Sequence, residues 1–388
     1  ALVEGWRFAD DRTRPADSLQ RILWQYSPEA WVLVRRAETM SGEIRVGDAW
    51  RIMPEGSGLR TIRNADGSEV RTVLTNKGFW KWIDRSKPFL DQLSDACTAV
   101  HELCHAWNSR AAAWALSQQK FDHSLAWQAA GSTRWLIRYT RFYLGRDNMP
   151  LALDRMVRGY PEAAAFPAKR IASLVPERLR TFRYKTYVGE RANHSCQLTG
   201  ISGLLDEYNA YYWSNRVPYE LYDYFRSELP ATGATWLAWL KEVRNHYFAW
   251  AEFRLWILAW LRVAEKEEPA VWRSVMEDMP LRRAFTVLDD EFTALIHKLF
   301  VRVFETLPAQ LGALGLEVRL RRSTTIDIAG KRHGDLALWV GNGFQGFMGY
   351  SFTPLVAEMN TPEYVRIANT FRLSPQGRLP ELPRVPER

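Results

Sequence analysis

Cysteine is scarce in this sequence. The chain has 3 cysteines among 388 residues, which excludes a scaffold held together by several disulfides. Cys97 and Cys104 fall on one expected helix, about 10 Å apart along its axis, which is too far for a bridge between them. At most one disulfide can therefore form, and it would use Cys196.

Long apolar runs are also absent. The most apolar stretch, residues 248–263, contains Glu252, Arg254 and Arg262, so we predict no membrane span. There are no internal repeats, and residues 330–332 lack the other residues of a phosphate-binding loop. Hydrophobic residues make up 47% of the chain and charged residues 25%, which is typical of a folded soluble protein.

Positive charge exceeds negative charge. The formal net charge is +8, and basic residues gather at 319–322 and 331–333. Such clusters attract anions, but no nucleic-acid-binding motif accompanies them, so we expect no nucleic acid partner.

The first residue is Ala1 rather than Met. This start is consistent with a removed signal peptide, so we expect a secreted or periplasmic protein, with a cytoplasmic location as the alternative.

One motif carries chemistry: the run His-Glu-Leu-Cys-His at residues 101–105. Residues four apart lie on the same face of a helix, so His101 and His105 can bind one metal ion. Glu102 lies beside them and can take a proton from a water molecule.

Two stripes of residues predict a helix around this motif. The apolar stripe is its expected buried face: Leu93, Ala96, Cys97, Val100, Cys104 and Trp107. A polar stripe runs beside it: Ser94, Thr98, His101, His105 and Asn108. We therefore expect both histidines to border the buried face and to reach a cleft.

The pattern of the whole chain predicts three segments. Residues 1–85 form a mixed α/β part of the catalytic unit, in which residues 30–75 alternate as short strands would. Residues 86–311 carry mostly helical periodicity, and residues 312–388 return to extended runs before a proline-rich tail. Pro218 predicts a helix break. We predict an α+β protein that is predominantly helical, with a small N-terminal sheet packed on the motif helix and with C-terminal strands.

A catalytic zinc ion needs a third protein ligand. The metzincin pattern is excluded, because asparagine and alanine stand where it requires glycine and histidine. We predict Glu207, which shares a helical face with Gly203 and Ala210, two small residues that permit close approach of another helix. Asp206, about 100° away around the helix, and His194 are the alternatives.

Two segments resemble the gluzincin group of zinc metallopeptidases. They are Val-His-Glu-Leu-Cys-His-Ala-Trp at 100–107 and Leu-Leu-Asp-Glu-Tyr-Asn-Ala-Tyr at 204–211. They are also similar to poorly described bacterial proteins that pair such a motif with such a helix. The resemblance covers only these segments. It implies a zincin-like catalytic core with Glu102 as general base, and three zinc ligands: His101, His105 and Glu207.

Two features depart from thermolysin-like enzymes. The interval between the motif and Glu207 is much longer, which implies a helical insertion. Tyr211 stands where those enzymes carry an aspartate that orients a ligating histidine. Another group must then orient the ligand, and the candidates are Asn108, Asp206 and a backbone carbonyl.

These residues predict zinc-dependent hydrolysis of peptide bonds in a peptide or protein substrate. Zinc would bring the pKa of a bound water to near 7, and Glu102 would move its proton to the leaving amine. We expect Tyr211 to stabilise the oxyanion, with Tyr212, His194 and His246 as alternatives.

Two other functions fit the same motif. One is a zinc amidase that acts on cell-wall peptides. The other is a structural or binding protein without catalysis, in which the motif is incidental. The sequence leaves the oligomeric state open.

Overall fold

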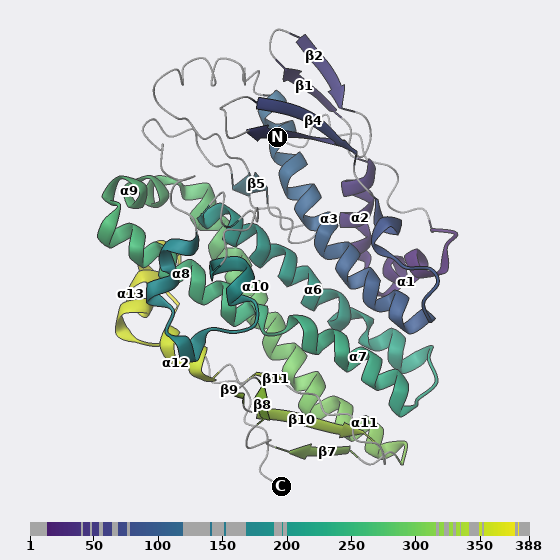
Figure 1. Ribbon diagram of the computed structural model, residues 1–388. Helices are drawn as coiled ribbons and strands as arrows, with labels where there is room; N and C mark the ends of the chain where they lie inside the picture. Colours follow the sequence, from purple (N-terminus) through teal and green to yellow (C-terminus); the bar gives the residue numbers. More distant parts are fainter. Residues whose placement is uncertain are drawn as a thin grey trace. The chain divides into compact units, whose positions relative to one another are not determined.

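Helices dominate the structure, which is a computed structural model (Figure 1). It describes residues 14–39, 42–46, 49–53, 57–63, 69–75, 78–118, 140–141, 151–152, 168–189, 196, 200–315, 318–321, 326–328, 331–333, 335–340, 349–350, 353–376 and 379. The chain divides into two compact units, which we call unit 1 (1–165 and 273–284) and unit 2 (166–272 and 285–388). The predicted boundaries, 1–85, 86–311 and 312–388, do not coincide with this division and stay a prediction.

Three helices lie wholly in unit 1: α1 (Ser18–Tyr26), α2 (Pro28–Thr39) and α3 (Phe89–Gln118). Asp17 caps α1, because its carboxylate accepts hydrogen bonds from the backbone amides of Leu19 and Gln20 at 2.8 and 3.2 Å. A 3₁₀ turn, Phe79–Trp82, precedes α3. Helix α2 packs against both α1 and α3.

The prediction of an α+β class was wrong, whereas the predominance of helices is confirmed. The extended segments pair only as separate antiparallel ladders: β1 (Gly42–Val46) with β2 (Ala49–Met53), β3 (Ser57–Arg63) with β4 (Glu69–Thr75), β5 (Thr140–Arg141) with β6 (Leu151–Ala152), β8 (Ile326–Ile328) with β9 (Lys331–His333), and β10 (Asp335–Val340) with β7 (Val318–Arg321) and β11 (Gly349–Tyr350).

These ladders do not join into one sheet within the described ranges. The expected N-terminal sheet and C-terminal strands therefore form no layer of the fold. A ladder of two or three short strands buries little apolar area, and the core is instead built by helices.

Unit 2 is built around α8 (Ala249–Glu267), which packs against α6 (Ile201–Ser227). Trp250, Trp256 and Trp260 of α8 are fully buried, and such burial on several faces is typical of a central helix. The other helices are α7 (Gly233–His246), α11 (Leu307–Ala313), α12 (Thr353–Met359) and α13 (Pro362–Phe371). Helices α9 (Pro269–Glu277) and α10 (Met279–Val301) have residues in both units.

Tighter and wider helical turns connect these helices of unit 2. Two are 3₁₀ turns, Ala168–Leu174 and Glu177–Leu179, and two are π turns, Lys185–Gly189 and Arg302–Thr306. The helix break predicted at Pro218 was wrong, because α6 continues through it.

Two expectations from composition can be compared with the structure. Cys97, Cys104 and Cys196 are all buried, and none of them forms a disulfide, so the one bridge that the sequence allowed is not made. Among the helices that the structure describes, none is long and apolar enough to cross a membrane, as predicted.

Candidate metal site

The motif lies on α3, and the predicted apolar stripe of this helix is buried. All six of its residues are at most 2% exposed. Asn108, which we predicted on the polar stripe, is only 1% exposed, and its amide donates a hydrogen bond to Cys104 Sγ at 3.7 Å. His101 and His105 are half-buried, so they lie at the edge of the buried face, as predicted.

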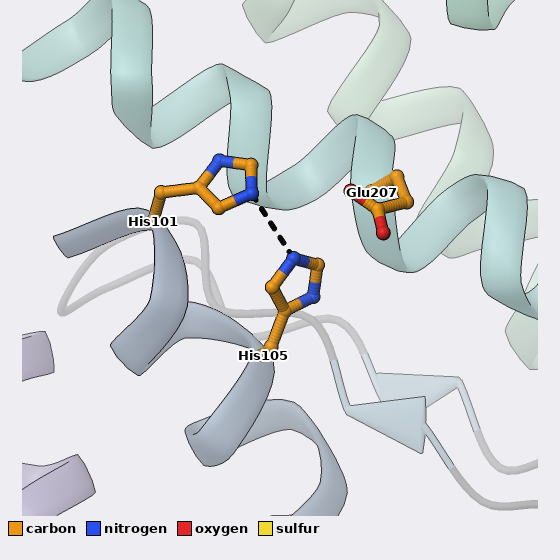
Figure 2. A group of neighbouring side chains, drawn as sticks. All are labelled: His101, His105 and Glu207. Carbon is orange, nitrogen blue, oxygen red and sulfur yellow. Dashed lines mark hydrogen bonds between the residues drawn. The ribbon is translucent and has the colours of Figure 1, made fainter. Parts of the chain in front are cut away.

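The two histidine rings point at each other. The distance between His101 Nε2 and His105 Nε2 is 3.1 Å (Figure 2). The ring planes are 79° apart, and the ring centroids are 4.8 Å apart. A hydrogen bond between these nitrogens requires one of them to carry a hydrogen and the other to accept it.

This geometry can be compared with that of a metal site. Two nitrogens bound to one tetrahedral zinc ion at about 2.0–2.1 Å lie about 3.3–3.4 Å apart. The observed 3.1 Å differs from that separation by only a few tenths of an ångström. The spacing of the two nitrogens on α3 therefore fits a shared metal ion.

Glu102 follows His101 on the same turn of α3 and is half-buried. Its carboxylate thus comes from the helix that supplies both imidazoles. A residue that exchanges protons with a metal-bound water must come from an element close to the metal ligands.

Glu207 lies in the second turn of α6 and is 6% exposed. The helix begins after Gly200, whose φ of 57° is in the left-handed region that favours glycine. Gly203 and Ala210, the small residues expected around Glu207, are buried, and so are four larger apolar neighbours: Leu204, Leu205, Tyr208 and Tyr212.

Figure 2 draws the three side chains that the sequence predicts as ligands: His101 and His105 of unit 1 and Glu207 of unit 2. Two imidazoles and one carboxylate are a donor set that holds catalytic zinc in proteins. Asp206, the alternative ligand, is half-buried, and His194 lies outside the described residues.

Tyr211 belongs to a buried network in unit 2. Arg183 Nε donates a hydrogen bond to the Tyr211 hydroxyl at 3.2 Å, and the Tyr187 hydroxyl lies 3.1 Å from the same oxygen. Arg183 Nη1 also donates to Glu252 at 2.8 Å, and Nη2 donates to the carbonyl of Asn245. Every nitrogen of this guanidinium thus has a partner.

Charge and burial act in opposite directions on this arginine. Burial favours the neutral form, but the carboxylate of Glu252 outweighs it and raises the pKa of Arg183. The arginine therefore stays charged, and its hydrogen-bond donors are fixed in place.

Sequence reasoning missed Arg183, Tyr187 and Glu252. One signal was available. Glu252 interrupts the most apolar stretch of the chain, and a charge on a buried helix needs a partner from elsewhere. That partner is Arg183, 69 residues away in sequence, so no local pattern pointed to it.

The alternatives to Tyr211 are placed as follows. Burial raises the pKa of Tyr212 to about 12, and Arg216 Nη1 donates to its hydroxyl at 3.4 Å. Burial and the charge of Arg183 lower the pKa of His246 to about 3, so this imidazole is neutral at physiological pH. Its ring lies 6.2 Å from that of Tyr211.

No protein-family model matches the chain. No curated protein and no solved structure matches it either. The resemblance to gluzincins therefore still depends on the two short segments alone, and the activity that it implies remains a proposal.

Proposed function

We propose that this protein is a zinc metallopeptidase. The observation that carries the proposal is the 3.1 Å separation of the two Nε2 atoms on α3, produced by histidines one helical turn apart. Glu207 supplies a buried carboxylate as the third ligand. Joint binding by the histidine pair and Glu207 is part of the proposal.

The protein's own residues divide the work. Bound zinc would polarise the scissile carbonyl and acidify a water molecule. His101 and His105 would each present Nε2, which requires the hydrogen of both neutral rings to lie on Nδ1. Glu102 would accept the proton of the attacking water and return it to the leaving nitrogen.

Metal content tests the ligands. We expect about one zinc ion per chain in the wild type, and weaker binding in His105→Ala and Glu207→Ala. His297→Ala is the matched control, because His297 lies on α10 outside the group of three. A wild type that binds no zinc after reconstitution contradicts the proposal. Undiminished zinc affinity in Glu207→Ala would remove Glu207 from the ligand set.

Peptide cleavage tests the activity. A peptide library analysed by mass spectrometry should show cleavage by the wild type and at least 100-fold less by Glu102→Gln, with zinc retained. Cleavage of cell-wall peptides alone would identify an amidase. If the wild type and Glu102→Gln bind zinc alike and neither cleaves any peptide faster than the other, the protein binds zinc without catalysis.

A further inference from the structure

Three groups in unit 2 form a chain of hydrogen bonds that ends beside α6: the Arg183 guanidinium, the Tyr211 hydroxyl and the Tyr187 hydroxyl. The first two are buried, whereas Tyr187 is only half-buried. The backbone of Tyr187 is held by Cys196, whose thiol donates to its carbonyl at 3.2 Å, and its ring lies 4.9 Å from that of Phe253.

The arginine permits a direction of this chain that leaves the hydrogen of Tyr187 for another acceptor. Arg183 has only donors, so the Tyr211 oxygen must accept from Nε. The Tyr211 hydroxyl then has its own hydrogen to give, and the Tyr187 oxygen at 3.1 Å can accept it. With its oxygen used as acceptor, Tyr187 directs its own hydrogen away from Tyr211.

Glu207 is the acceptor that we assign to that hydrogen. It precedes Tyr211 by four residues on α6, so the two residues share a face of that helix. The charge of Glu207 is also the main electrostatic cause, after burial, that raises the pKa of Tyr187. The carboxylate and the phenol therefore act on each other within unit 2.

We propose that Tyr187 is a positioning residue: its hydroxyl, oriented by Arg183 through Tyr211, donates to the Glu207 carboxylate and sets that carboxylate for metal binding. This inference rests on the proposed metal site. It supplies the group that orients the carboxylate ligand in place of the candidates suggested by the sequence.

Zinc affinity of the full chain tests this role, measured by competition with a chromogenic chelator. We expect about 10–100-fold weaker zinc binding in Tyr187→Phe and a smaller loss in Tyr211→Phe. The control is Tyr184→Phe, because Tyr184 lies three residues away and its hydroxyl donates to the Ala172 carbonyl instead. Zinc affinity in the control should equal that of the wild type.

A second measurement separates positioning from damage to the fold. In a Glu207→Ala background, Tyr187→Phe should cause no further loss of zinc affinity, because the carboxylate that it orients is gone. A merely structural role would lower the affinity equally in both backgrounds. The absorption spectrum of bound Co²⁺ should change in Tyr187→Phe but not in Tyr184→Phe.

The outcomes distinguish this inference from the proposed function. Wild-type affinity in Tyr187→Phe, or a larger loss in Tyr211→Phe than in Tyr187→Phe, overturns the inference and leaves the metal site intact. Zinc binding that does not depend on Glu207 overturns both.

Discussion

Unit 2 contains two buried arginine networks that use the same two helices in different ways. In one network, Tyr211 of α6 and Glu252 of α8 meet Arg183. In the other, Tyr208 of α6 and Arg254 of α8 meet Asp289 of α10 at 3.0 and 2.8 Å. Helix α8 thus supplies the acidic residue of the first network and the basic residue of the second.

The two networks differ in how they end. Asp289 is fully buried, and its second oxygen accepts from Arg372 at 2.6 Å, so buried arginines bind both oxygens of this central carboxylate. The Arg183 network instead extends to the hydroxyl of Tyr187, which is half-buried and for which we propose Glu207 as the acceptor. A closed network of buried charges stabilises the fold, whereas an open one can also orient a group outside it.

The largest expected effect is on the closed network. Asp289→Asn removes the negative charge that Arg254 and Arg372 share, so two buried guanidinium groups lose their common ion-pair partner. This change should lower the unfolding free energy by about 3–5 kcal/mol. Urea unfolding measures this loss. Asp290→Asn is the control, because Asp290 is 53% exposed and a small loss is expected there. Equal losses in the two variants would contradict the assignment of Asp289 as the centre.

A matched pair of arginine variants separates the two networks. Lysine keeps the charge but cannot reproduce the three contacts of a planar guanidinium, so Arg183→Lys and Arg254→Lys should each cost about 2 kcal/mol. Only Arg183→Lys should also weaken zinc binding, by about tenfold. Urea unfolding and chelator competition measure the two quantities. Weaker zinc binding in Arg254→Lys would show that the second network is not closed.

Removing one hydroxyl gives a smaller effect. In Tyr208→Phe the Asp289 carboxylate loses one donor but keeps both arginines, so about 1–1.5 kcal/mol of unfolding free energy should be lost. Zinc affinity should stay at the wild-type value, in contrast to Tyr211→Phe, three residues along the same helix. If both variants lost zinc affinity alike, distortion of α6 would explain the effect better than the relay through Tyr187.

The sequence predicted what local spacing determines. The interval of four residues in the motif determines the histidine pair on α3, and apolar spacing predicted its buried stripe correctly. Local propensity gave a wrong prediction at Pro218, because α6 continues through this residue. The carbonyl of Pro218 accepts a hydrogen bond from the indole nitrogen of Trp239 at 2.8 Å. Alternation of apolar and polar residues predicted a sheet but could not show that the strands pair only as ladders.

The buried networks depend on partners far apart in sequence. Arg183 and Glu252 are 69 residues apart, and Arg372 and Asp289 are 83 apart. No periodicity records such a pairing. The sequence does show that Glu252 and Arg254 need charged partners, because both lie in a stretch that is otherwise too apolar to be exposed.

The smallest expected effect concerns pH and His246, which borders the open network. Burial and the charge of Arg183 lower its pKa to about 3, and they outweigh the Glu242 carboxylate, 3.8 Å from its Nε2. The ordinary pKa is about 6.5, so below that pH the unfolded chain binds a proton that the folded protein does not. The folded state therefore loses stability as the pH falls from 6.5 toward 3.

Between pH 7 and pH 6 this histidine should lower the unfolding free energy by about 0.7 kcal/mol. His246→Gln removes the titrating group, so urea unfolding at the two pH values should give a correspondingly smaller difference for the variant than for the wild type. His297→Gln is the comparison, because burial also lowers the pKa of His297 but the charge of Arg183 does not act on it. If the wild type and His246→Gln lose the same free energy between pH 7 and pH 6, then burial and the charge of Arg183 do not keep His246 neutral in the folded protein.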